Sequence, residues 1–159
     1  METIGKWMKR EVVSTRPDAT LREVAALVLE KRVGTLPVVD DEGKLVGTVS
    51  ITDIVKLFLP DFVTIMDEID FVHDYGNLEN TTAEDRQRAK TIHVSDVMEE
   101  PVAMEDDAGL VHALSVMEKH NLRDLIVIRE GKLVGIASQV DIVRAFLTEF
   151  TKETGPLYS

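Results

Sequence analysis

The feature that most constrains this chain is an internal repeat. The letters EGKLVG at 42–47 recur unchanged at 130–135, and DIV at 53–55 recurs at 141–143. The offset is 88 residues over these positions and 89 upstream of them, and the one-residue difference falls in an acidic, Gly-containing turn. A turn is where a change of length costs least. The chain is therefore expected to consist of two copies of one structural unit.

The sequence pattern of each copy predicts the element order βαββα. In the first copy, a short extended piece at 12–13 precedes a helix that begins near Leu21, because apolar residues then recur every three or four positions. Two β-rich runs at 36–39 and 44–49 predict a hairpin, and a helix at 52–59 follows. The second copy places the same elements at 102–104, 110–117, 125–128, 132–137 and 140–149.

One such unit could bury little more than one side of a small sheet, so two units are expected to pack together. The predicted fold class is therefore α/β (α+β). The predicted organisation is a first repeat at 1–59, an inserted helix and linker at 60–92, a second repeat at 93–150 and a C-terminal tail at 151–159.

The composition excludes several classes of protein. The chain has no cysteine, which rules out a disulfide scaffold, a thiolate metal site and a cysteine nucleophile. Its net charge of −11 disfavours a nucleic-acid partner, because duplex binding depends on Lys and Arg neutralising phosphates. No apolar run approaches the roughly 18 to 20 residues that cross a bilayer, and residues 1–7 do not form a secretory signal. We expect a cytoplasmic protein that binds neither nucleic acid nor membrane.

A second shared pattern follows the last strand of each copy. It reads Gly47-Thr48-Val49-Ser50-Ile51-Thr52-Asp53 in the first copy and Gly135-Ile136-Ala137-Ser138-Gln139-Val140-Asp141 in the second. These residues resemble the cystathionine-β-synthase (CBS) domain family, whose signature is Gly-hydrophobic-x-Ser/Thr-x-x-Asp at this point. Thr48 departs mildly from the pattern. The resemblance covers residues 4–58 and 94–150.

The resemblance implies tandem CBS domains packed with pseudo-twofold symmetry, as a stand-alone pair of the Bateman type. Such pairs have two clefts for adenosine derivatives and commonly form disc-shaped homodimers. Asp53 and Asp141 match the carboxylate that holds the ribose hydroxyls, and Ser50 and Ser138 match the hydroxyl that meets phosphate. A carboxylate accepts from both hydroxyls of a diol, and the start of a helix favours an anion. The alternative is that Ser-x-x-Asp only caps the helix.

The same resemblance implies further contacts. Adenine would lie against the segments that contain Val13 and Val102, although valines at such positions are more often core residues. The turns that contain Gly34 and Arg123 would close the clefts, and a guanidinium suits phosphate. The neighbouring Asp124 would repel phosphate, which makes the second cleft chemically mixed.

Other positions differ between the two copies or carry a charge near the clefts. Ile126 stands where the first copy has Pro37, so the two units are not equivalent. Lys56 and Arg144 follow each Asp by one helical turn. They would either add positive potential over the clefts or belong to a solvated face.

The insert has an apolar stripe at helical spacing, which predicts an amphipathic helix that extends a dimer contact. The stripe consists of Phe62, Ile65, Met66, Ile69 and Val72. The polar stretch at 80–88 predicts a loop with a short helix. Possible metal ligands in the insert are Asp67, Glu68, Asp70, His73 and Asp74. A metal site would need further ligands that the sequence does not place, so no metal is predicted. His93, His112 and His120 are expected to be exposed or at an edge.

The predicted function is an adenine-nucleotide sensor, without catalytic activity, that binds AMP, ADP or ATP and changes its contacts with other subunits or with a protein effector. No hydroxyl has an identifiable His base, and neither a P-loop nor a zinc signature is present. One alternative is a sensor of S-adenosylmethionine, which has no phosphate and would tolerate Asp124 better. The other is a ligand-free interaction module that docks onto another enzyme or transporter.

Overall fold

The computed structural model describes residues 2–58 and 83–153, which form two compact units. Unit 1 comprises Met1–Val12, Asp41–Leu45 and Pro101–Ser159, and unit 2 comprises Val13–Asp40 and Val46–Glu100. Unit 1 therefore combines most of the second repeat with two short segments of the first, and unit 2 combines most of the first repeat with the start of the second. The boundaries of the repeats at 1–59 and 93–150 stay a prediction.

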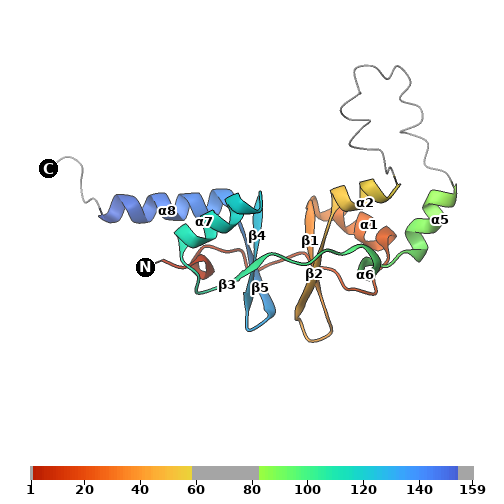
Figure 1. Cartoon of the computed structure of the whole chain (residues 1–159), viewed down its shortest axis with the longest axis horizontal. Coiled ribbons are helices and arrows are strands. Elements are labelled where there is room, and N and C mark those ends of the chain that lie inside the picture. Colours follow the sequence, from red (N-terminus) through yellow and green to blue (C-terminus); the bar gives the residue numbers. More distant parts are fainter. Residues whose placement is uncertain (1, 59–82, 154–159) are drawn as a thin grey trace, which may run out of the picture. The chain divides into compact units, whose positions relative to one another are not determined.

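Unit 1 is a three-stranded sheet with two helices (Figure 1). The strand order is β3-β4-β5, with β3 parallel and β5 antiparallel to β4. The elements are the 3-10 helix η1 (Ile4–Lys6), β3 (Ala103–Glu105), α7 (Leu110–Lys119), β4 (Asp124–Arg129), β5 (Lys132–Ser138) and α8 (Gln139–Glu153).

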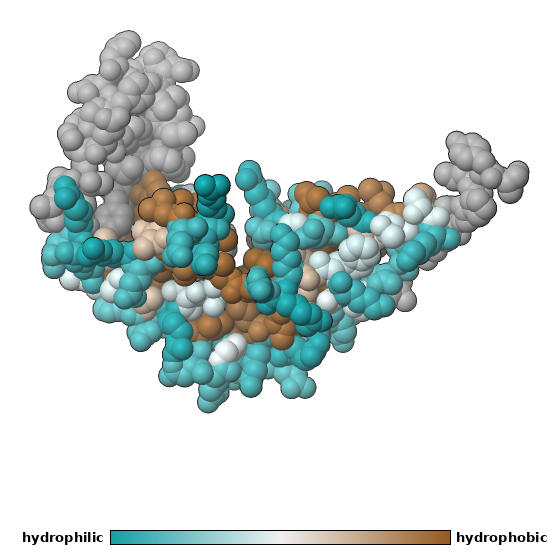
Figure 2. All heavy atoms as spheres, turned by 180° about the vertical axis from the view of Figure 1, so that it is seen from behind, coloured by the Kyte–Doolittle hydropathy of each residue, from teal (hydrophilic) through white to brown (hydrophobic). Residues whose placement is uncertain are grey.

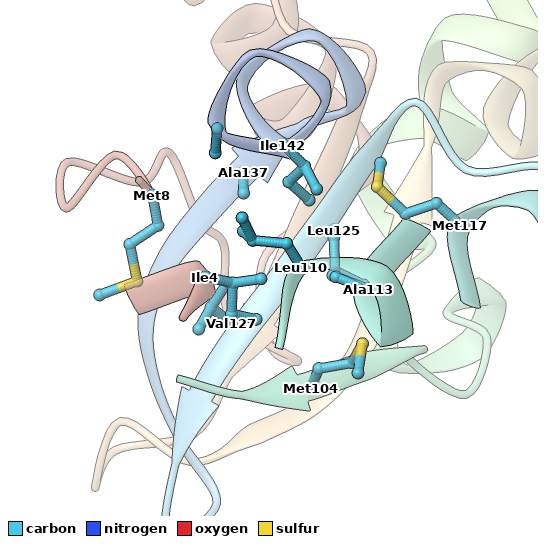
Figure 3. Packing of buried hydrophobic residues seen from close by; sticks show 11 residues of the cluster. Ile4, Met8, Met104, Leu110, Ala113, Met117, Leu125, Val127, Ala137 and Ile142 are labelled. Carbon is cyan, nitrogen blue, oxygen red and sulfur yellow. The ribbon is translucent and has the colours of Figure 1, made fainter. Parts of the chain in front are cut away.

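The core of unit 1 lies where both helices pack on one face of this sheet. Leu110 of α7, Ile142 of α8 and Leu125 of β4 meet in one cluster (Figure 3). All three side chains are almost completely buried, and each such burial contributes about 1.5–3 kcal/mol. Ile4 and Met8 belong to the same cluster although they come from the N-terminal segment. That segment is thus part of the core of unit 1.

Unit 2 has a two-stranded sheet, β1-β2, with its helices (Figure 1). Its core is a cluster of buried aliphatic side chains that includes Val24, Leu36 and Val49. The elements are α1 (Leu21–Lys31), β1 (Thr35–Val39), β2 (Leu45–Ser50), α2 (Ile51–Phe58), α5 (Ala83–Thr91) and α6 (Val94–Val97).

The short extended piece predicted at 12–13 is wrong as a strand. The chain pairs with β1 two residues later, at Thr15, through a single parallel bridge to Val38. The Thr15 amide donates to the carbonyl of Pro37 at 2.9 Å, and the Val39 amide donates to the carbonyl of Thr15 at 2.9 Å. In unit 1 the matching piece forms the full strand β3. This single bridge satisfies the amide and the carbonyl of Thr15, and the pairing does not extend into a strand.

The glycine of the signature is explained in unit 1 by the N-terminal segment. The backbone of Lys9 pairs with Ile136 of β5, with N–O distances of 2.8 and 2.9 Å. This pairing brings Met8 onto Gly135, where an added Cβ would lie 2.3 Å from the Met8 Sδ and 2.9 Å from the Lys9 carbonyl oxygen. Only a residue without a side chain allows the segment to approach so closely.

Unit 2 repeats this arrangement with the start of the predicted second repeat. The backbones of Glu99 and Thr48 exchange two hydrogen bonds of 2.9 Å. A Cβ on Gly47 would lie 2.7 Å from the Met98 Sδ and 3.2 Å from the Glu99 carbonyl oxygen. Each signature glycine is therefore a site of close backbone approach.

The EGKLVG repeat corresponds to the two hairpin turns. Gly43 and Gly131 both have a φ of +82°, a left-handed conformation that glycine adopts without steric cost. The Leu45 amide donates to the carbonyl of Gly131 at 2.9 Å, and the Leu133 amide donates to the carbonyl of Gly43 at 3.1 Å. The turns thus satisfy each other's backbone groups.

The predicted α/β (α+β) class is confirmed, as are the two hairpins and the four helices that flank them. The polar stretch expected to contain a short helix does so, as α5. The amphipathic helix and the potential metal ligands at 62–74 lie outside the described residues. No helix in 2–58 or 83–153 is long and apolar enough to cross a membrane.

Candidate functional site

The junction of β2 and α2, which we call the first corner, joins Ser50 and Asp53 by reciprocal hydrogen bonds. The Ser50 amide donates to Asp53 Oδ2 at 3.2 Å, and the Asp53 amide donates to Ser50 Oγ at 3.1 Å. This is a capping box, in which two amide groups at the start of the helix gain partners. Both side chains are half-buried.

The junction of β5 and α8, the second corner, has the same geometry. The Ser138 amide donates to Asp141 Oδ2 at 3.4 Å, and the Asp141 amide donates to Ser138 Oγ at 3.1 Å. These side chains are also half-buried. The four residues predicted as the centre of the site therefore form two equivalent pairs.

The predicted turn before each hairpin is joined to its corner by a backbone hydrogen bond. The Ile51 amide donates to the carbonyl of Gly34 at 2.9 Å, and the Gln139 amide donates to the carbonyl of Arg123 at 2.8 Å. Gly34 and Arg123 thus lie beside the corners, and their closing of a ligand cleft stays a prediction. The Arg123 side chain is exposed, and the exposed Asp124 follows it. Positive and negative side chains therefore both flank the second corner.

Capping uses only part of what each corner offers. Among the described residues, each Asp accepts through Oδ2 alone, which leaves Oδ1 as an acceptor. Each Ser Oγ accepts one hydrogen bond, and its O–H group stays available as a donor. A half-buried acceptor and a donor one helical turn apart suit a ligand with hydroxyl and anionic groups. Capping and ligand contact are compatible.

The remaining predicted residues are placed less directly. Val13 packs against the core of unit 2, which supports its alternative role as a core residue. Val102 is half-buried immediately before β3. Lys56 and Arg144 are exposed one turn beyond each Asp.

The described histidines show no sign of a metal site. His112 lies exposed on α7, and His120 lies exposed at its C-terminal end. The His93 amide donates to Asp96 Oδ2 at 3.0 Å at the start of α6. In the part of the chain that the structure describes, no three His, Asp or Glu residues are grouped to hold a metal ion.

Sequence reasoning did not foresee two surface pockets away from the corners. One, of about 290 Å³, lies in unit 1 beside Arg129, which donates to Asp106 through Nε at 2.7 Å. This hydrogen bond and the attraction of the Asp106 charge raise the pKa of the exposed Arg129. The other pocket, of about 260 Å³, lies in unit 2 between α1 and α5. No motif in the sequence marks either pocket, because each is formed by residues distant along the chain.

The repeat corresponds to a known family. The model of the CBS domain matches residues 4–60 and 94–148. The uncharacterized protein MJ1426 of Methanocaldococcus jannaschii is 31% identical over 88% of this chain and 88% of its own length.

Longer relatives match over part of their length only. CBSX1, a chloroplastic CBS domain-containing protein of Arabidopsis thaliana, is 29% identical over 91% of this chain. The chain spans 64% of CBSX1 and 38% of the uncharacterized protein MJ1232 of Methanocaldococcus jannaschii, at 29% identity over 89% of this chain.

Solved structures of the same kind are similar over most of the chain. CBSX2 of Arabidopsis thaliana is 26% identical with a TM-score of 0.71, over 93% of this chain and 96% of that one. A crystal structure of CBSX2 in complex with AMP has 26% identity and a TM-score of 0.68, over 95% of this chain and 100% of that one. The CBS domain of a membrane protein from Sphaerobacter thermophilus has 25% identity and a TM-score of 0.66, over 89% and 86%.

Proposed function

Because the chain belongs to the CBS domain family, we propose that it is a non-catalytic regulatory module that binds an adenosine-containing ligand at its two strand–helix corners. The observation that carries this proposal is the same serine–carboxylate pair, with the same hydrogen bonds, at Ser50 and Asp53 and at Ser138 and Asp141. The AMP complex of CBSX2, at 26% identity, supports the ligand class.

The chemistry of each corner suits a nucleoside. The free Oδ1 of Asp53 or Asp141 accepts from the two hydroxyls of a ribose, which a carboxylate does better than any neutral group. The O–H of Ser50 or Ser138 lies at the start of a helix, where the dipole favours phosphate. A ligand that presents a diol and an anion a short distance apart is therefore preferred.

The charge near each corner bears on the choice of nucleotide. The chain has a net charge of −11, so phosphate must be attracted by local cations. Arg123 and Arg144 flank the second corner together with the opposing Asp124, whereas Lys56 is the cation one turn beyond Asp53. AMP, with the fewest phosphates, is the first nucleotide to test, before ADP and ATP. S-adenosylmethionine is the alternative that needs no phosphate contact.

Calorimetry with these four ligands tests the proposal, and Asp53→Asn/Asp141→Asn separates ligand binding from capping. Asparagine keeps one oxygen for the cap but presents an amide in place of the second oxygen, so the diol loses an acceptor. The matched control is Glu23→Gln in the capping box of α1, where Glu23 Oε2 accepts from the Thr20 amide at 3.1 Å and the Glu23 amide donates to Thr20 Oγ1 at 3.2 Å.

We expect the double variant to lose binding and the control to keep it. Ligand at about 100 times its Kd would raise the free energy of unfolding of the parent chain by about 2.7 kcal/mol for each occupied corner. Absence of heat with all four ligands, or equal binding by the parent and the double variant, would refute the proposal. Hydrolysis of ATP by purified protein would refute the non-catalytic part.

We also propose that the module forms a homodimer through α8. The helix has exposed apolar side chains at Val140, Val143, Leu147 and Phe150, and this spacing places them in one stripe along it. Figure 2 shows apolar side chains at the surface over this part of unit 1. Val140 is 64% exposed and Leu147 52%. Exposed apolar stripes of this kind are typical of protein interfaces. The predicted helix in the insert would extend the same contact.

Sedimentation of Leu147→Asp tests the homodimer, because a charge in the stripe would have to be buried without a partner. The control is Leu29→Asp on α1, where the leucine is 78% exposed and lies outside the stripe. We expect Leu147→Asp to be monomeric and Leu29→Asp to stay dimeric. A monomeric parent chain would refute the homodimer. The effector that would receive the signal and the cytoplasmic location stay predictions.

A further inference from the structure

A pocket of about 260 Å³ between α1 and α5 is lined by Arg22, Arg86, Ala89 and Lys90. We propose that it is a second binding site, separate from the corners, for a small anion that carries one or two phosphate groups. The observation that carries the proposal is a hollow lined by cations and one alanine, in a chain whose net charge is −11.

The cations come from two helices that are held together at their ends. The Leu21 amide at the start of α1 donates to the carbonyl of Ile92, just after α5, at 3.0 Å. Arg86 and Lys90 are four residues apart on α5 and so share one face of it. The neighbouring acid on α1, Glu23, directs its carboxylate to the cap at Thr20. An anion in the pocket would offset the repulsion between Arg22 and Lys90.

The ordinary explanation for basic residues at the end of a helix accounts for only part of this cluster. Lys90 lies in the last turn of α5, where a cation stabilises the helix dipole. Arg22 lies in the first turn of α1, where the dipole disfavours a cation. Arg86 has a further polar partner, so the proposal depends on Arg22 and Lys90. The helix dipole therefore does not explain the cation at Arg22, whereas a bound anion would.

The dimensions and the chemistry of the pocket favour phosphate. A pocket of about 260 Å³ has room for one or two phosphate groups, and its lining of three cations and one alanine offers no aromatic surface for a base. A guanidinium binds two phosphate oxygens in a fork, and an ammonium binds as a point charge. Arg22 and Lys90 would thus hold the same group from two sides.

Calorimetry with inorganic pyrophosphate tests the second site in the full chain. The variant is Arg22→Gln/Lys90→Gln, and the matched control is Lys31→Gln/Lys119→Gln, which removes two exposed charges elsewhere. Because the variant removes two charge-assisted contacts to phosphate, we expect it to lose at least about tenfold in affinity. The control should stay within about twofold, since remote surface charges act weakly. A thermal melt of each variant checks that it is folded.

Measuring each ligand with the variant of the other site distinguishes the pocket from the corners. Pyrophosphate should bind Asp53→Asn/Asp141→Asn as it binds the parent chain, and AMP should bind Arg22→Gln/Lys90→Gln as it binds the parent chain. Equal weakening of pyrophosphate in the variant and the control would show general charge attraction and overturn the second site. Absence of pyrophosphate binding to the parent chain would also overturn it. Neither result would bear on AMP at the corners.

Discussion

Substitution of the signature glycine in unit 1 is expected to destabilise the protein strongly. In Gly135→Ala the new Cβ would lie 2.3 Å from the Met8 Sδ, and this flexible side chain can move. It would also lie 2.9 Å from the Lys9 carbonyl oxygen, which is held by the hydrogen bond from the Ile136 amide. The backbone must shift, and overpacking of this kind typically costs about 1–3 kcal/mol. We expect about 2–3 kcal/mol.

Gly47→Ala and Gly34→Ala provide an internal scale for this effect. At Gly47 the nearest backbone atom, the Glu99 carbonyl oxygen, would be 3.2 Å from the new Cβ, so a cost of about 1 kcal/mol is expected. At Gly34 no atom lies within 4 Å, and the alanine should be neutral or stabilising by up to about 1 kcal/mol.

Urea unfolding of the three variants gives the order of stability directly. If Gly135→Ala is no less stable than Gly34→Ala, the N-terminal segment does not pack on β5 as described. Met8→Ala in the Gly135→Ala background removes the sulfur contact but leaves the Lys9 carbonyl in place. The effects of the two substitutions on stability should therefore be non-additive by about 0.5–3 kcal/mol. The double variant should still be less stable than Met8→Ala alone.

Two further predictions concern the turns and the caps. Gly131→Ala should cost about 1–2 kcal/mol of stability through its φ of +82° alone, because the atom nearest to the new Cβ would be the Lys44 Cε at an ordinary 3.5 Å. Urea unfolding measures this cost, and a neutral result would contradict the left-handed turn. Ser138→Ala and Thr20→Ala should each cost about 1 kcal/mol as cap residues, but only Ser138→Ala should also weaken nucleotide binding. Equal nucleotide affinity in both would limit Ser138 to capping.

The sequence predicted those parts of the fold that local pattern determines. The hairpin turns followed from the repeated glycines such as Gly131, and the corners followed from Ser-x-x-Asp after a β-rich run. The packing of Met8 on Gly135 was missed, because periodicity within one segment does not indicate which distant strand the segment covers. A signal was present: Met98 follows Val94 as Met8 follows Ile4, and each methionine packs on the signature glycine of the other repeat.

The placement of the candidate site residues depends on local pattern for the same reason, whereas their role in ligand binding stays a prediction. Asp53 lies three residues after Ser50, so the local chain alone places them together, and Gly34 joins them through a hairpin contact that the β-rich runs already imply. Val13 is different, because its role depends on which surface its segment meets. The structure packs it against the core of unit 2. The pocket at Arg22 and Lys90 had no sequence signal, because it requires α1 and α5 to lie side by side.

Capping helps to explain how so small a site could bind a nucleoside. In each corner the carboxylate and the hydroxyl are already held by hydrogen bonds of 3.1–3.4 Å to the backbone amides. Ligand binding would then order no long side chain, which otherwise costs about 0.5–1.5 kcal/mol for each one immobilised. The same bonds stabilise α2 and α8 when no ligand is bound. Under the proposed function, each serine–aspartate cap would be both a structural element and a preorganised half of a binding site, and the oxygen that capping leaves free is the one that Asp53→Asn and Asp141→Asn remove.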